Sequence, residues 1–365
     1  MKRILKDSKG VALVIVIFVA TALFTIVSSA LLFSSLDLKL TGNRKLSDAA
    51  IQVADTGIHH ALAVIPVGTT FSYTSETTIL NSVSFGGGYS YTVKAINDPA
   101  SSGGNSRAIL TSTALGPNGT KKVIVAYIGR GSLGLGATSL PGSSAATTET
   151  NFSGTSFSIN GNDNCNTAPP VPGIVVTDPA LATEITNNTT SDGGLASNQM
   201  GLVTGAGGSP SVATIAPLAQ TVSQIAEAYL ALPHTTLSGG NYSSNENWGT
   251  ASSPRITRIT GDAQIQGTVE GYGVLIVEGN IEVAGNFTFY GLVIARGDAQ
   301  VQITGNAGIY GSLVIGESIT QDAGFELDVR GNANIRFDSC ALSPANSWVS
   351  LPKKAKLLAW QEKFT

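Results

Sequence analysis

The strongest constraint on this chain is an uncharged apolar segment that runs from Val11 to Ser35 and lies between Lys9 and Asp37. A helix rises about 1.5 Å per residue and the hydrocarbon core of a bilayer is about 30 Å thick, so roughly 20 apolar residues span it. The segment is long enough and predicts a transmembrane helix. A secretory signal is the alternative, but its apolar region usually has only about 7–15 residues. The small residues at 28–30 leave signal cleavage open.

Basic residues precede the segment and fix its expected orientation. They are Lys2, Arg3, Lys6 and Lys9. Because positive charge is retained in the cytoplasm, we expect a single pass with a short cytoplasmic amino terminus. Everything after Asp37 is then exported.

The surroundings of the apolar segment carry a resemblance to a known family. A basic leader ends in Ser8-Lys9-Gly10, the run beginning VALV follows, and Ala54-Asp55-Thr56-Gly57 lies beyond it. In the order and spacing of these features, roughly residues 1–65 resemble PilX-type minor pilins of type IV pili. The resemblance implies an inner-membrane protein that is assembled into a pilus or a related pseudopilus.

The same resemblance implies processing and assembly roles for particular residues. Prepilin peptidase would cut after Gly10, the new amino terminus at Val11 would be methylated, and Asp55 and Gly57 would serve assembly. The fifth mature residue would be Ile15. Most major pilins carry Glu there, which compensates a neighbour's terminal amine in an apolar filament core.

That departure from the major-pilin pattern implies a rare subunit that initiates the filament or lies near its tip. Its expected partners are other minor and major pilins, prepilin peptidase, the inner-membrane assembly machinery and membrane lipid. Adhesion is a further role that such a subunit could have.

Composition favours an exported, passive protein. Among 365 residues there are 42 glycines, only 12% are charged, and the net charge is −3. These values favour turns and β structure over solvated helices. No basic stripe interleaved with aromatic residues is present, so we expect no nucleic-acid partner.

After the membrane segment, apolar residues continue at helical spacing up to Pro66, which ends the helix predicted over 11–65. They are Leu38, Leu46, Ala49, Ala50, Val53, Ala54, Gly57, Ile58 and Ala61. Residues 66–130 carry strand signals in TFSYTS, YSYTVKAI, RAILTSTAL and KKVIVAYI, with a turn at 116–119. This pattern predicts a small antiparallel head whose sheet covers the apolar stripe of the helix.

A glycine motif follows the last of these strands. Residues 129–134, GRGSLG, match the spacing of a dinucleotide fingerprint, but LGATSLPGSS comes next and has no helical period. The fingerprint needs a helix there to hold the pyrophosphate. We therefore interpret the glycines as the exit from the head and expect no cofactor.

The middle of the chain predicts loops and one helix. Residues 131–212 are rich in Gly, Ser, Thr and Asn, which favours irregular loops with one strand pair near 151–163. Over 213–233, apolar residues at Ile215, Leu218, Val222, Ile225, Tyr229 and Leu232 predict an amphipathic packing helix with Pro217 in its first turn.

The carboxyl-terminal third holds an internal repeat over 255–340. Asn286, Asn306 and Asn332 are spaced 20 and 26 residues apart, about the length of one solenoid coil. Gly-Asn and Gly-Asp pairs are expected at positive-φ corners, and Ile281, Val283, Phe287 and Phe289 are expected to point inward. The prediction is a bactofilin-like β-solenoid, a right-handed parallel β-helix, with a β-sandwich as the alternative. Residues 341–365 are expected to cap it.

The overall fold class is thus α+β with a β-solenoid. The two cysteines, Cys165 and Cys340, lie in the exported part, so a single disulfide is predicted, with two buried thiols as the alternative.

Two classes of function remain. The favoured one is a structural, non-enzymatic minor pilin. The alternative is a membrane-anchored carbohydrate-active β-helix enzyme, for which two carboxylates about 5–10 Å apart would be needed. The candidate acids are Glu270, Glu278, Glu282, Asp298, Glu317, Asp322, Glu326 and Asp328. His59, His60 and His234 lack metal-ligand spacing, and a cytoskeletal polymer is disfavoured by the membrane helix.

Overall fold

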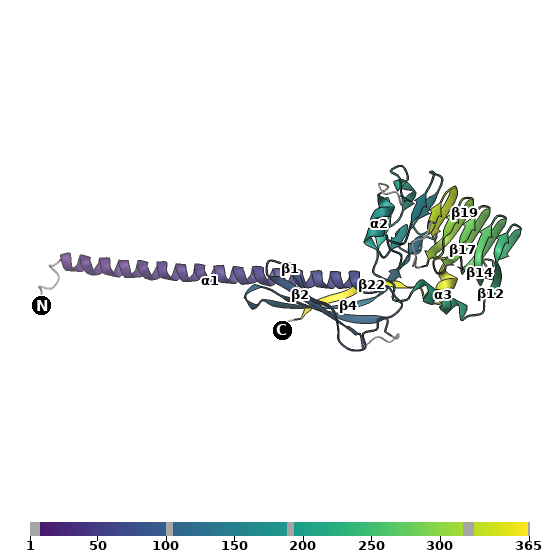
Figure 1. Ribbon diagram of the computed structural model, residues 1–365. Coiled ribbons are helices and arrows are strands. Elements are labelled where there is room, and N and C mark those ends of the chain that lie inside the picture. Colours follow the sequence, from purple (N-terminus) through teal and green to yellow (C-terminus); the bar gives the residue numbers. More distant parts are fainter. Residues whose placement is uncertain (1–7, 100–104, 188–192, 317–324, 364–365) are drawn as a thin grey trace.

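The computed structural model describes residues 8–99, 105–187, 193–316 and 325–363. A single long helix, α1 (Ser8–Val64), projects from a small antiparallel sheet, and a parallel β-solenoid lies at the opposite end of that sheet (Figure 1). The predicted fold class is therefore confirmed in its three parts: a long apolar helix, an antiparallel head and a β-solenoid.

Helix α1 has 57 residues and is about 85 Å long at 1.5 Å per residue. Its second half packs on the head, with Ala50, Val53, Ala54, Ile58 and Ala61 all buried as predicted. Leu38 was expected on the same stripe but is 73% exposed. The reason is that the helix becomes buried only from about residue 46 onward, where the strands of the sheet begin to lie beneath it.

The head sheet has five antiparallel strands in the order β1-β2-β3-β4-β22. They are β1 (Thr77–Gly86), β2 (Tyr89–Asn97), β3 (Arg107–Leu115), β4 (Lys121–Leu133) and β22 (Lys353–Lys363). The predicted meander is present, with the turn η1 (Pro117–Gly119) between β3 and β4. Residues 70–75 were expected to form its first strand, but β1 begins only at Thr77.

Strand β22 corrects the prediction that residues 341–365 cap the solenoid. It pairs with β4 along its length, from Lys353 beside Leu133 to Lys363 beside Val123. The short helix α4 (Ser343–Trp348) precedes it. The solenoid is therefore an insertion between two neighbouring strands of the head, and both of its connections return to the same sheet edge.

The solenoid is built from two segments of the chain. The first contains β5 (Thr138–Leu140), β6 (Thr150–Phe152), β7 (Ser158–Asn160), β8 (Ile174–Val176), β9 (Gly193–Gly194), β10 (Val203–Thr204) and β11 (Val212–Thr214), with α2 (Pro179–Thr186) and η2 (Met200–Leu202) between strands. The second contains β12 (Thr235–Tyr242), β13 (Asn245–Trp248), β14 (Arg255–Ile265), β15 (Thr268–Val277), β16 (Ile281–Val283), β17 (Asn286–Ala295), β18 (Val301–Ile303), β19 (Asn306–Ile315), β20 (Leu327–Val329) and β21 (Asn332–Phe337).

The two segments stack in an order that differs from their order in the chain. Strands β19, β20 and β21, which end the second segment, pair in parallel with β5, β6 and β7, which begin the first. The coils of residues 138–214 thus lie between the head and the coils of residues 235–337. Loops were expected over 131–212, but the structure has short strands there. The sequence did not indicate them, because strands of only two or three residues are too short to show an alternating pattern.

The repeat predicted from the sequence is present in register. Asn286, Asn306 and Asn332 occupy equivalent positions, and their side-chain amides form a ladder with two hydrogen bonds of 3.0 Å. The four residues that were expected inside, Ile281, Val283, Phe287 and Phe289, are at most 3% exposed.

The glycine prediction was only partly correct. Gly285 and Gly305, which precede ladder asparagines, do not have positive φ. They are needed because a Cβ would lie 2.3–2.4 Å from a backbone oxygen of the preceding coil. Gly261, Gly297 and Gly331, which precede Asp or Asn, do have the expected positive φ (110°, 80° and 72°). Positive φ also occurs within the long strands, as at Gly291 (140°) and Gly311 (145°), where the chain turns from one face of the solenoid to the next.

Helix α3 (Val222–Leu230) is shorter than the helix predicted over 213–233. Thr221 and Gln224 form a capping box that starts it. Residues before the cap follow a different path, because β11 pairs with β8 and Ile215 joins a separate cluster with Val67. At the far end of the solenoid, Tyr242 lies edge-on to the buried Trp248, with ring centroids 5.2 Å apart, and covers the first coil.

Candidate functional site

The amino-terminal half of α1 projects away from the head (Figure 1), and its large apolar side chains are exposed. Phe18 is 76% exposed and Phe24 is 74% exposed. Burying a large apolar side chain is worth about 1.5–3 kcal/mol, so this surface requires apolar surroundings. Within the described residues, α1 is the one helix long and apolar enough to cross a membrane.

Several hydroxyl groups on this surface donate hydrogen bonds to carbonyl oxygens of the helix itself. Thr25 donates to the carbonyl oxygen of Ala22 at 2.8 Å, and Ser29 donates to that of Thr25 at 2.6 Å. Polar groups need internal partners in a bilayer, because the hydrocarbon core supplies none. These bonded hydroxyls therefore do not oppose insertion.

The processing residues Gly10 and Val11 both lie within α1, near its first residue, Ser8. Residues 1–7, with most of the basic leader, lie outside the described residues. Ile15 is 57% exposed and belongs to the apolar surface. The assigned roles of these three residues remain predictions.

The two other assembly candidates lie where α1 meets the sheet. Gly57 is buried, and a Cβ at this position would lie 2.5 Å from Ser112 Oγ and 3.0 Å from the Tyr91 ring. Asp55 is on a more exposed side of the helix and lies 3.8 Å from His59 Nε2. Gly57 therefore allows close helix–sheet packing, whereas an assembly role for Asp55 remains a prediction.

Arg130, on β4, binds the segment that follows α1 and the start of β22, and it was not singled out from the sequence. Its guanidinium donates to the carbonyl oxygens of Pro66 (2.7 Å), Thr70 (2.6 Å) and Lys353 (3.2 Å). The group also lies 4.1 Å above the centre of the Phe71 ring. Burial lowers the pKa of Arg130, but the group remains cationic because its ordinary pKa exceeds 12.

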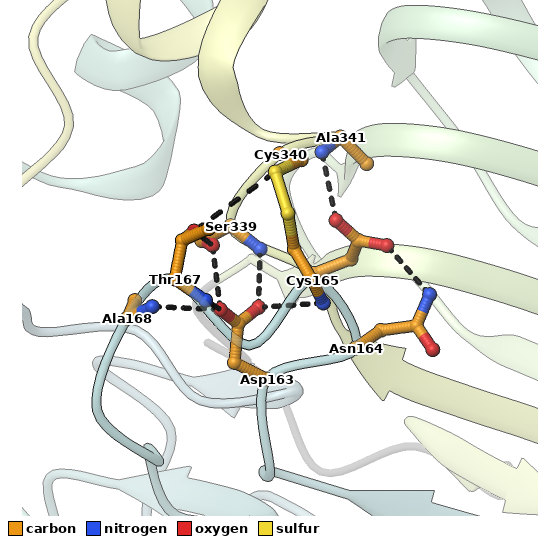
Figure 2. Close-up of a disulfide and its surroundings, with 9 residues drawn as sticks. Asp163, Asn164, Cys165, Thr167, Ala168, Ser339, Cys340 and Ala341 are labelled. Carbon is orange, nitrogen blue, oxygen red and sulfur yellow. Dashed lines mark hydrogen bonds between the residues drawn. A yellow bond between two sulfur atoms is a disulfide. The ribbon is translucent and has the colours of Figure 1, made fainter.

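A disulfide joins the two solenoid segments (Figure 2). Cys165 follows β7 and Cys340 follows β21, and their Cα atoms are 5.9 Å apart. Because β7 and β21 are neighbours where the two segments meet, the bond links adjacent coils that lie 175 residues apart in the chain.

Asp163 reinforces this junction from beside the disulfide (Figure 2). Its carboxylate accepts hydrogen bonds from the backbone N–H groups of Cys165, Thr167, Ala168 and Ser339 and from the Ser339 hydroxyl. Burial alone would raise the pKa of Asp163, but these donors outweigh it and lower the pKa to about 2. The carboxylate therefore stays ionised at neutral pH.

Cys165, Asp338 and Cys340 lie close enough for their potential ligand atoms to share a metal ion. The two sulfur atoms are bonded to each other and offer no thiolate. The Asp338 carboxylate accepts hydrogen bonds from Asn164 Nδ2 (2.8 Å) and Ala341 N (2.9 Å). The cluster is therefore structural.

The candidate acids for carbohydrate chemistry are mostly engaged elsewhere. Glu278 pairs with Arg258 at 2.8 Å and Arg296 at 3.1 Å. Asp328 is bound by Gln302, Asn151 and Arg330. Glu317 and Asp322 lie outside the described residues. His59 contacts Asp55, His60 Nδ1 lies 2.7 Å from the Tyr91 hydroxyl, and His234 contacts Leu232.

Comparisons with known proteins give little further information. No protein-family model matches the sequence, and no curated protein matches it. Among solved structures, the competence-associated pilin ComZ from Thermus thermophilus is similar at 9% identity, over 87% of this chain and 96% of that chain, with a TM-score of 0.24. A TM-score this low does not establish a shared fold.

Proposed function

We propose that this protein is a membrane-anchored, pilin-like structural subunit that displays a β-solenoid outside the cytoplasm. The observation that carries the proposal is the form of α1. One continuous helix leaves an apolar segment fully exposed and then packs, through Ala54 and Gly57, on a small antiparallel sheet. Such a segment can lie in a bilayer and later in a bundle of like helices, while the head stays in water.

The finer assignment follows the sequence resemblance to PilX-type minor pilins. In this proposal, prepilin peptidase removes residues 1–10 in the inner membrane and the amine of Val11 is methylated. The subunit then associates with other pilins through the apolar half of α1. The disulfide between Cys165 and Cys340 suits an oxidising compartment outside the cytoplasm.

Ile15 supports a position at the end of a filament. Without a carboxylate at the fifth mature position, the subunit cannot compensate a neighbour's terminal amine, and an uncompensated charge in an apolar bundle is costly. The solenoid, which lies beyond the head in Figure 1, adds a steric reason, because repeated copies would crowd neighbouring heads along a shaft.

The test is the chemistry of the mature amino terminus, measured by intact mass and amino-terminal sequencing of protein extracted from membranes. The proposal expects a terminus at Val11 and loss of processing in Gly10→Val. Gly42→Val is the matched control, because Gly42 lies in the same helix with nothing within 4 Å of a Cβ. An intact Met1, a terminus near residue 30, or normal processing of Gly10→Val would contradict the proposal.

A further inference from the structure

Three tyrosines form an aromatic ladder on the outside of the solenoid. Tyr272, Tyr290 and Tyr310 occupy equivalent positions in successive coils. The ring centroids are 4.5 Å apart for the first pair and 5.0 Å for the second, and the rings are nearly parallel. All three side chains are partly exposed. A stack of this kind stabilises the coils, but one end of it is left open.

The open end is at Tyr272, because the next coil supplies no ring. Trp248 pairs with Gly271, so the residue aligned with Tyr272 is Gly249. Gly249 has a φ of 107° and its Cα lies beside the Tyr272 backbone, where a side chain would collide with the Tyr272 carbonyl oxygen. The chain leaves the coil at this point, and the outer side of the Tyr272 ring therefore has no neighbour from the ladder.

A cavity of about 230 Å³ adjoins this end of the ladder. Its walls include Tyr272 and Tyr290 on the solenoid, Pro254 from the turn before β14, and Asp338, Ala341 and Pro344 from the segment leading into α4. Tyr310 does not line it. The volume is below the roughly 300–1,000 Å³ typical of drug-sized ligands, which limits the occupant to about one six-membered ring.

The chemistry of the walls selects among single rings. Aromatic and proline side chains offer an apolar surface, while the tyrosine hydroxyls supply polar contacts at its margin. The Tyr272 hydroxyl donates to Glu270 Oε1 at 3.2 Å, so its oxygen can still accept a hydrogen bond. No lysine or arginine lines the cavity, so its walls supply no cationic side chain for an anion.

A cation would have to compete for the one carboxylate in the walls, because both of its oxygens already accept hydrogen bonds within the protein. Asp338 is 7% exposed and accepts hydrogen bonds from Asn164 and Ala341. We propose that the cavity beside Tyr272 is a binding site for one ring of a neutral saccharide, which stacks on the open end of the tyrosine ladder. This site does not depend on the proposed assembly role, since binding can be measured on the isolated protein.

The experiment uses the full-length protein in a polyoxyethylene detergent, since maltoside and phosphocholine head groups are themselves potential ligands. The probes are the methyl glycosides of glucose, mannose and galactose and free N-acetylglucosamine, detected by saturation-transfer NMR and titrated for affinity. We expect at least one to bind and Tyr272→Ala to weaken it about tenfold or more. Tyr310→Ala is the matched control and should change affinity less than about twofold.

A second variant distinguishes loss of the binding site from a folding defect in Tyr272→Ala. Ala341→Phe fills the cavity from the opposite wall and leaves the ladder intact, and it should also abolish binding. The proposal is overturned if none of the four probes binds, or if Tyr272→Ala and Ala341→Phe bind as well as the parent. Binding of tetramethylammonium in preference to all four probes would overturn it as well, by identifying a cation site.

Discussion

The Asp163 carboxylate accepts two hydrogen bonds from Ser339, one from its backbone N–H at 2.8 Å and one from its hydroxyl at 2.7 Å, across 176 residues of sequence. Asp163 follows β7 and Ser339 follows β21, so this contact spans the junction between the two solenoid segments. In the opposite direction, the Asp338 carboxylate accepts a hydrogen bond from Asn164 Nδ2 at 2.8 Å. The loop after β7 and the loop after β21 thus each contribute a carboxylate that accepts hydrogen bonds from the other loop, next to the disulfide.

The first prediction concerns acid stability of this junction. The pKa of Asp163 is about 2 in the folded protein, below its ordinary value of 3.8. A lowered pKa means that the ionised form stabilises the fold above about pH 4, and that this contribution is lost as pH falls from about 4 to 2. Asp163→Asn should lower the free energy of unfolding at pH 7 by about 2 kcal/mol and flatten its dependence on pH below 4.

Denaturant unfolding at several pH values measures this effect, with Glu246→Gln, an acid on the first coil, as the control. Equal acid sensitivity in the parent and in Asp163→Asn would show that Asp163 does not control the transition.

The second prediction concerns the disulfide. A bond between neighbouring coils restricts a very long loop in the unfolded chain, and such bonds stabilise by about 2–4 kcal/mol. For a unit of this size, the replacement of both Cys165 and Cys340 by Ser should lower the melting temperature by roughly 5–15 °C.

Reductant should produce the same fall in the parent and none in the double variant. Two free thiols in the denatured, unreduced parent, or melting that does not respond to reductant, would contradict this expectation.

Local sequence patterns predicted the helix, the meander and the repeated coils, because each depends on neighbours in the chain. Phe287 and Phe289, for example, alternate with polar residues within one strand. The pairing of β22 with β4 could not be predicted this way, because paired residues such as Lys363 and Val123 lie far apart in the sequence. The alternation in β22 is weak because most of its side chains are exposed.

The candidate site was predictable to a similar degree. Two cysteines in an exported region allow one bond, but the coil contact that brings them together comes from the stacking of the two segments. Asp163 and Arg130 were missed because their partners are mostly backbone groups, which leave no pattern in the sequence. A single arginine directly after the apolar run of β4 was the one available signal.

The third prediction tests the packing of α1 on the head. A methyl group at position 57 would meet Ser112, Tyr91 and Val93 at 2.5–3.2 Å. Gly57→Ala should therefore destabilise the head by about 1–2 kcal/mol, as expected for overpacking. Gly42→Ala adds the same methyl group with no contact within 4 Å, and it should be neutral or stabilising by up to about 1 kcal/mol. Thermal unfolding of both variants in detergent measures the difference, and equal effects would contradict the packing role.

The fourth prediction tests the proposed position in a filament and uses Ile15 and its neighbour Ile17. Both are exposed to a similar extent, 57% and 55%, but only Ile15 would be the fifth residue after cleavage at Gly10. Ile15→Glu should place a carboxylate near a neighbour's terminal amine and increase incorporation along the shaft, because the buried amine is then compensated.

The matched variant, Ile17→Glu, carries the same charge without that partner, and it should be incorporated less than the parent. Immunogold labelling of filaments measures copy number and position for all three proteins. The parent should label filament ends or the cell envelope. Uniform labelling of the parent along shafts, or the same response to both substitutions, would show that charge compensation at residue 15 does not limit assembly.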